Sequence, residues 1–415
     1  MGPGIVIALT WLGAGDLVDS AVLGGNYGYE LMWAMAFALF VRFVLVSIIA
    51  KYQLCNPHGE SVLAGLRRIH PLLPVLFGFL ALVFAHAYGS FSLKGSGETT
   101  AALFGFEPDS WWDEGFAFLW AFVGYWIVFR GAFHRVEKAA YVLLGLLSIS
   151  LIGVAIWAGP NPSAAVQGVF LFSVPDQQGR YGVLLVVISL IGAVGGSIAN
   201  LLYPYFIQQK GWQGPQYRRL QLYDLAFGTS VVIILNLSVW TIGAEILHPR
   251  GLTVGELSDL TRLLTQALGN LGGPIFYLGA FAALFSTLVG NATGYGYMLT
   301  DIARMTGKAK RERSFSQSWI YRAVAAWCLF SPLVWCLPGM PGFVTLTVVV
   351  NAASVIILPL LAAGLWYIAT NETCIGPVYK NRWWENGVMA GLFILACWGS
   401  WKAVVEVGRV MLGNS

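Results

Sequence analysis

An acidic residue interrupts the first apolar stretch of the chain. Residues 5–12 would begin a membrane-spanning helix, residues 13–16 (Gly-Ala-Gly-Asp) interrupt it, and residues 17–23 resume it. A carboxylate is expensive in hydrocarbon, so Asp16 is by default a functional residue. The glycines weaken the helix beside it. Because unwound backbone at membrane depth must face protein or water, the segment predicts a broken helix that carries a binding site.

A second glycine-rich interruption follows in the other half of the chain. Residues 192–200 read Gly-Ala-Val-Gly-Gly-Ser-Ile-Ala-Asn and include Gly196, Ser197 and Asn200. A pair of interrupted apolar segments in corresponding positions of two halves is the best sequence pointer to a transporter binding site.

The composition is that of an integral membrane protein. The chain has 415 residues, of which 57% are hydrophobic and only 11% charged, whereas a soluble domain is about a quarter charged. The five cysteines are scattered and indicate neither a disulfide framework nor a zinc site. No folded basic face suggests nucleic acid. Catalytic and nucleotide-binding motifs are absent, which argues against an enzyme and against an ATP-driven pump.

About eleven segments are long and apolar enough to cross a bilayer, since a span needs about 20 apolar residues. They lie near 4–24, 29–50, 72–104, 115–130, 137–158, 181–207, 224–247, 272–300, 318–337, 342–369 and 385–411. Basic residues cluster in alternate loops, which predicts a cytoplasmic N-terminus in a multi-pass cell-membrane protein. Short helices are expected between spans at 61–70, on the cytoplasmic face, and at 253–269, on the outer face.

The positions of the two breaks predict the fold. If spans one to five and six to ten are inverted halves, the breaks correspond, as in the all-helical LeuT-type five-plus-five inverted repeat. We therefore expect one transmembrane domain over residues 1–415. Its repeats would cover about 1–158 and 181–369, with an additional helix at 385–411.

The chain resembles the Nramp family of divalent-metal transporters. The resemblance is carried by residues 2–4 (Gly-Pro-Gly), the first broken helix, residues 25–29 (Gly-Asn-Tyr-Gly-Tyr), Leu31 and Trp33. It implies the fold predicted above and a divalent cation as the transported substrate, with no separate cofactor.

The resemblance also indicates which positions hold the metal. The family signature Asp-Pro-Gly-Asn in span one aligns its aspartate with Gly13 and its asparagine with Asp16. In span six, only Asn200 matches the family motif Met-Pro-His-Asn, and the methionine falls on Gly196 or Ser197. A metal-site glutamine in span ten falls on Asn351.

The resulting donor set consists of oxygen atoms. Asp16, Asn200 and Asn351 are the predicted metal ligands, with Ser197 and freed carbonyls near Gly13 and Gly196 around them. Carboxylate, amide and carbonyl oxygens favour hard cations such as Mg²⁺ or Mn²⁺. The alternative for both asparagines is hydrogen bonding between helices, and the alternative for Asp16 is a helix cap.

Five further residues are candidates for gating or coupling. Asp19 lies one turn beyond Asp16. Lys94 and Glu98 form an i, i+4 pair in span three, where an internal ion pair is the simpler interpretation. His86 is either a hydrogen-bonded core residue or a proton relay. Arg322 resembles a family arginine in span nine.

The sequence thus favours a secondary-active transporter that brings a Mn²⁺- or Mg²⁺-like cation into the cytoplasm by alternating access. A monomer in the lipid bilayer is expected to hold the whole pathway. Two alternatives stay open. One is a LeuT-type symporter for a small organic solute such as an amino acid, and the other is a non-transporting sensor.

Overall fold

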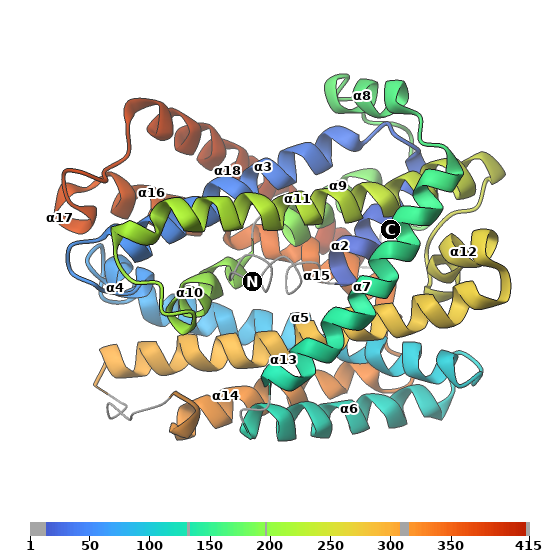
Figure 1. Ribbon diagram of the computed structural model, residues 1–415, viewed down its shortest axis with the longest axis horizontal. Helices are drawn as coiled ribbons and strands as arrows, with labels where there is room; N and C mark the ends of the chain where they lie inside the picture. The colour runs from blue at the N-terminus through green and yellow to red at the C-terminus, as the bar shows by residue number, and fades with distance from the viewer. Residues whose placement is uncertain (1–13, 131–132, 196, 308–314, 412–415) are drawn as a thin grey trace.

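The computed structural model describes residues 14–130, 133–195, 197–307 and 315–411, and within these residues every regular element is helical (Figure 1). The α-helices are α2 (Ala14–Tyr27), α3 (Met32–Cys55), α4 (Val62–Arg67), α5 (Leu73–Leu103), α6 (Trp111–Phe129), α7 (Phe133–Ala158), α8 (Pro162–Phe170), α9 (Val183–Leu190), α10 (Tyr203–Gln209), α11 (Arg218–Ile242), α12 (Leu257–Leu268), α13 (Gly272–Met305), α14 (Trp319–Phe330), α15 (Phe343–Ser354), α16 (Leu358–Thr370), α17 (Glu372–Ile375) and α18 (Trp383–Met411).

Short π and 3₁₀ segments lie between these helices. The π segments are η1 (Ile191–Gly195) and η4 (Gly243–Leu247). The 3₁₀ segments are η2 (Ile198–Leu202), η3 (Pro215–Tyr217), η5 (His248–Arg250), η6 (Gly269–Leu271), η7 (Phe315–Gln317), η8 (Ser331–Cys336) and η9 (Val355–Ile357).

The long helices follow the predicted membrane spans. Within the described residues, eight helical segments are long and apolar enough to cross a membrane, or nine if one bent pair counts as a span. The expected number of about eleven also includes α2, whose preceding residues lie outside the described part, and α6, whose first turn carries Asp113 and Glu114. That larger number stays a prediction.

The sixth span is broken where its glycines predicted a break. Regular α-helix ends at Leu190, a π segment follows to Gly195, and Ser197 is extended with φ −131° and ψ 164°. A 3₁₀ turn then leads into α10. The predicted break at residues 13–16 begins outside the described residues, and from Ala14 onward the chain is helical with Asp16 in the first turn.

The fifth span ends in a sharp bend that the sequence analysis did not predict. Helix α7 ends at Ala158, and α8 departs at 103° from it. Gly159 takes a positive φ of 74°, which favours glycine. Asn161 then caps α8 through its side chain, and Pro162 fits the first turn, where no backbone N–H is needed.

The predicted helices at 61–70 and 253–269 are confirmed, although both are shorter than expected. Ser61 caps α4 by accepting a hydrogen bond from the Ala64 amide. Glu256 and Asp259 form a reciprocal capping box at the start of α12.

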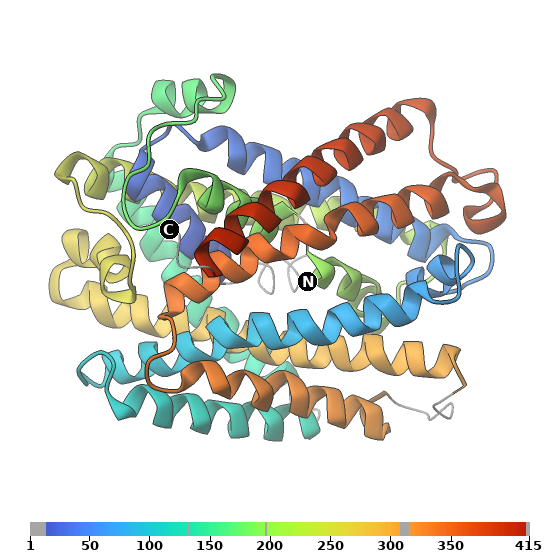
Figure 2. The same cartoon turned by 180° about the vertical axis from the view of Figure 1, so that it is seen from behind.

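The long helices form two groups. In both views, α5, α6, α13 and α14 lie together in one half of the molecule, while α3, α9, α11, α16 and α18 lie in the other (Figures 1 and 2). In the first group, α5 contacts α13 and α6. Helix α2 contacts α9 and α11 and therefore belongs to the second group. We call these groups the α5–α13 group and the α2–α3 group.

Candidate functional site

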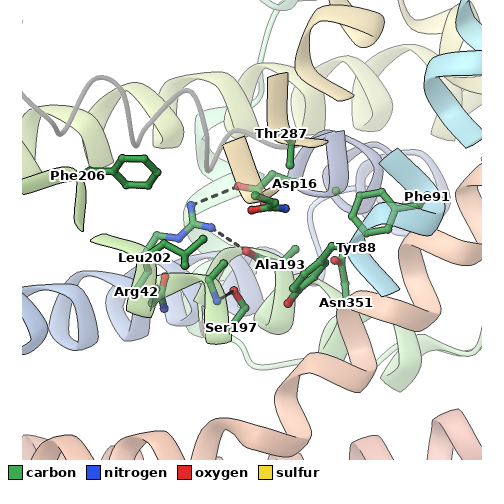
Figure 3. A pocket seen from close by; sticks show the side chains of 14 residues that line it. Asp16, Arg42, Tyr88, Phe91, Ala193, Ser197, Leu202, Phe206, Thr287 and Asn351 are labelled. Carbon is green, nitrogen blue, oxygen red and sulfur yellow. Dashed lines mark hydrogen bonds and ion pairs between the residues drawn. The ribbon is translucent and has the colours of Figure 1, made fainter. Parts of the chain in front are cut away.

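A small cavity of about 70 Å³ lies where the two groups meet (Figure 3). The α2–α3 group contributes Gly15, Asp16, Arg42 and residues of the broken sixth span, α15 contributes Asn351, and the α5–α13 group contributes the rest. Its lining residues are Gly15, Asp16, Arg42, Tyr88, Phe91, Ala193, Ser197, Ala199, Asn200, Leu202, Phe206, Thr287, Asn291 and Asn351. Asp16, Ser197, Asn200 and Asn351, which lie far apart in the sequence, therefore surround one space.

Asp16 forms a buried ion pair in this cavity. Nη1 of Arg42 lies 3.4 Å from Oδ2 of Asp16, and both side chains are 4% exposed. Nη2 of Arg42 donates to the carbonyl oxygen of Ala193 at 2.7 Å. Ala193 belongs to the π segment of span six, where the irregular backbone leaves this carbonyl turned to the guanidinium. Figure 3 draws both contacts as dashed lines that lead from the Arg42 guanidinium to Asp16 and to Ala193.

Asn351 is held by the second acid of α2. Its Nδ2 donates to Oδ2 of Asp19 at 3.1 Å, and the Ser189 hydroxyl donates to Oδ1 of Asp19 at 2.7 Å. Because Nδ2 is engaged, Oδ1 is the atom that Asn351 can offer to a cation. Asp19 is fully buried and is not among the lining residues. It therefore positions Asn351, and any direct contact with cargo stays a prediction.

Several lining side chains keep unpartnered polar atoms. Within the described residues, Nδ2 of Asn200 and Oγ1 of Thr287 are buried and have no hydrogen-bond partner. They come from opposite groups of helices and line the same space. Buried polar groups are otherwise almost always paired, so such atoms indicate a place for water or a polar ligand.

His86 lies apart from the cavity. Trp335 Nε1 donates to its Nε2 at 2.9 Å, and its Nδ1 is 2.9 Å from the Ser331 hydroxyl. Because Nε2 accepts, the proton of a neutral imidazole would sit on Nδ1. The ring also packs against Trp327. Of the two interpretations of His86, these contacts fit a hydrogen-bonded packing residue. A role as proton relay stays a prediction.

The remaining coupling candidates also lie elsewhere. Lys94 and Glu98 line a separate cavity of about 410 Å³ with Asp109, Asp113 and Glu114. The Lys94 ammonium lies 3.5 Å from the Met340 carbonyl. Arg322 is exposed and stacks 4.5 Å above the Phe129 ring.

Gly13 and Gly196 lie outside the described residues. The structure does not test the expectation that their backbone carbonyls face the cargo.

Sequence reasoning missed Arg42, Tyr88 and Thr287 as lining residues. Arg42 carried a usable signal, because it is a charged residue in the middle of an apolar span. Tyr88 and Thr287 carried none, since such residues are common in membrane helices.

The polar atoms that line the cavity are oxygen and nitrogen atoms. The negative charge of Asp16 is balanced there by the positive charge of Arg42. Within the described part of the chain, no three His, Cys, Asp or Glu side chains are grouped closely enough to hold a metal ion. A cation would therefore rely on one carboxylate, on neutral oxygens and on water.

Comparison with known proteins gives a consistent result. A sequence model described as natural resistance-associated macrophage protein-like, or Nramp, matches residues 4–405. The divalent metal cation transporter MntH of Chromohalobacter salexigens is 23% identical over 308 residues, covering 71% of this chain and 68% of that protein. MntH of Verminephrobacter eiseniae is 22% identical over 390 residues, covering 92% and 83%.

Solved structures show the same fold. A mutant of the Eremococcus coleocola manganese transporter aligns with a TM-score of 0.77 at 15% identity, covering 100% of this chain and 87% of that one. Mhp1, a nucleobase-cation-symport-1 family transporter, aligns with a TM-score of 0.55 at 14% identity, covering 98% and 90%. The predicted all-helical LeuT-type fold is confirmed. Since the family model extends over nearly the whole sequence, the chain belongs to the natural resistance-associated macrophage protein-like (Nramp) family.

Proposed function

We propose that this protein is a secondary-active transporter of a divalent metal cation of the Mn²⁺ or Mg²⁺ kind. The observation that carries the proposal is the convergence of Asp16, Ser197, Asn200 and Asn351 on one cavity beside the break in span six. Oxygen donors of this kind suit hard cations. The relatives named as divalent metal cation transporters and the structural neighbour named as a manganese transporter support the same substrate class.

The size of the cavity favours a small cargo. Its volume of about 70 Å³ is several times the roughly 10–15 Å³ that a cavity must offer to hold one water molecule. A cation with a few waters fits this space. Pockets for drug-sized organic ligands usually measure about 300–1,000 Å³.

The position of the cavity supports transport by alternating access. It lies between the α5–α13 group and the α2–α3 group, so a rocking motion of one group against the other would open it to either side in turn. With basic loops on the cytoplasmic side, the N-terminus is cytoplasmic and the cation moves inward across the cell membrane. A monomer holds the pathway.

A small zwitterionic solute is the second candidate, and the Asp16–Arg42 pair favours it. Asp16 alone would repel a carboxylate. Arg42, which lies 3.4 Å from Asp16, supplies the cationic partner that an amino acid's carboxylate needs, while Asp16 could take its amine.

Isothermal titration of the purified full-length protein separates these candidates. Mn²⁺, Mg²⁺, glycine and alanine are titrated in turn, and Mn²⁺ and Mg²⁺ uptake into proteoliposomes is measured with an entrapped metal-sensitive dye. We expect saturable binding and uptake of a cation. Binding of the amino acids with no response to either cation would replace the first candidate with the second.

A further inference from the structure

The Arg42 guanidinium lies against Asp16, the residue that the proposed function assigns to the cation. It comes from the middle of α3 and is almost fully buried. A guanidinium keeps its positive charge inside proteins. Asp16 therefore has a counter-ion that is covalently attached to the chain (Figure 3).

The contacts of this guanidinium with Asp16 and with Ala193 differ in length. Nη2 is 2.7 Å from the Ala193 carbonyl, whereas Nη1 is 3.4 Å from the Asp16 carboxylate. Charge-assisted hydrogen bonds between a guanidinium and a carboxylate usually measure about 2.7–2.9 Å. The contact with Ala193 is thus the short anchor, and the contact with Asp16 is the one that a competing ion can replace.

We propose that Arg42 is a tethered competitor for the cation site. Cargo binds by displacing Nη1 from Asp16, while the Ala193 carbonyl keeps the guanidinium at the cavity wall. This inference rests on the proposed function, because it takes Asp16 to be the residue that holds the cargo. The unpartnered Asn200 amide and Thr287 hydroxyl give the cargo's water molecules further partners in the same cavity.

Displacement makes Arg42 a specificity-determining residue. A monovalent cation gains no more Coulomb energy from Asp16 than the guanidinium that it must displace, and it also has to shed water. A divalent cation gains about twice as much, because the interaction scales with the product of the charges, and it avoids most of its larger dehydration cost by keeping several waters in the cavity. The tethered charge therefore excludes K⁺ and Na⁺, which are far more abundant than any divalent metal.

Titration calorimetry with Mn²⁺ on the full-length protein tests this inference. Arg42→Gln removes the competing charge and keeps an amide that can reach Ala193. We expect its Mn²⁺ dissociation constant to fall at least about tenfold, given the coupling energies of close buried charge pairs. Arg42→Lys keeps a tethered charge and should stay near the parent. If Arg42→Gln is not monodisperse, Arg42→Met makes the same comparison.

A control on the same helix separates displacement from a general charge effect. Lys51 is also buried in α3, and it pairs with Glu385 at 2.8 Å, away from the cavity. Lys51→Gln should leave Mn²⁺ affinity unchanged. In an Asp16→Asn background, the gain from Arg42→Gln should disappear.

Potassium provides a second readout that a merely structural role would not change. Mn²⁺ affinity is compared in KCl and in N-methyl-D-glucamine chloride at equal ionic strength. We expect no difference for the parent and competition by K⁺ for Arg42→Gln. If the parent binds Mn²⁺ and Arg42→Gln binds it equally or more weakly, displacement is wrong and the proposed function stands. If neither the parent nor any variant binds Mn²⁺ or Mg²⁺, the proposed function fails, and this inference fails with it.

Discussion

Among the described residues Asp16 is the acid that lines the cavity, and its charge should dominate cation binding. Removing one partner of a buried charged contact costs roughly 3–5 kcal/mol, and each 1.4 kcal/mol is about tenfold in affinity. Asp16→Asn keeps the size and a carbonyl oxygen that can still accept from Arg42. We therefore expect a folded protein whose divalent-cation affinity is at least about a hundredfold lower, measured by calorimetry and liposome flux.

The neutral ligands provide the comparison for Asp16→Asn. Asn200→Ala and Asn351→Ala each remove an oxygen donor without removing charge, so each should lower affinity by less. If Asp16→Asn binds and transports like the parent, the carboxylate is only part of the first turn of α2 and the cation site lies elsewhere.

Ser197 provides a test of ion preference. It lies in the break of span six and lines the cavity, and the resemblance to the family implies a methionine at or beside this position. Ser197→Met adds a thioether, which favours softer ions. We expect the ratio of Cd²⁺ to Mn²⁺ affinity to rise in competition titrations. Ser197→Leu, which has similar bulk without sulfur, is the control and should not raise that ratio.

At the residue scale, sequence reasoning named the oxygen-bearing side chains of the cavity but missed the positive charge that Arg42 places beside them. Asp16, Ser197, Asn200 and Asn351 line one cavity, as the resemblance to the family implied for residues of one site, and their role as cation ligands stays a prediction. Arg42 was not predicted, because the pairing of two distant charges depends on how α3 faces α2 and the sixth span. The same limit applies to His86, whose partners Ser331 and Trp335 come from a segment about 245 residues away.

At the element scale, close backbone contact between span six and α15 shapes the site. A Cβ atom on Gly192 would lie 1.9 Å from the Asn351 backbone oxygen. Gly192→Ala must therefore push the π segment away from α15, and overpacking of this kind typically costs about 1–3 kcal/mol. We expect a lower thermal unfolding temperature in detergent together with weaker cation binding.

Gly391 is the matched control for this substitution. It lies within α18, and a Cβ atom there would meet nothing within 4 Å. Alanine is favoured over glycine in a helix interior by roughly 0.5–1 kcal/mol, so Gly391→Ala should be neutral or stabilising. Equal unfolding temperatures for the two variants would show that the close approach at Gly192 does not constrain the site.

The elements differ in how well the sequence predicts them, because some depend on long sequence patterns and others on short ones. Long apolar runs and paired glycine breaks fix the spans and the position of the broken sixth helix, because both follow from local composition. The turn from α7 into α8 depends on the conformation of Gly159 and the cap at Asn161. Those signals are short and common in loops, so they do not reveal that a helix follows at 103°.

At the scale of the whole molecule, the two groups of helices meet at the cavity. Proton transport beside the cation would need titratable side chains along the helices that reach this cavity, and α5 is one of them. The resemblance to the family implies that its acidic relay positions in span three correspond to Gly89 and Ser92 of α5, and this alignment stays a prediction. A Cβ atom on Gly89 would lie 2.4 Å from the Pro332 ring and 3.0 Å from the Cys328 carbonyl. A larger side chain at Gly89 would therefore require η8 to shift away from α5. Ser92 is fully buried and carries no charge.

We therefore expect cation transport with weak or absent proton co-transport. The measurement is a proteoliposome assay in which an entrapped pH-sensitive dye is followed during divalent-cation uptake, with a metal-sensitive dye in parallel samples. The interior pH should stay constant while cation enters, apart from a leak that protein-free liposomes share. Cation-dependent acidification beyond that leak would contradict the prediction. His86→Gln, Lys94→Gln and Glu98→Gln would then show which group carries the proton, because only the variant that removes the relay would lose acidification.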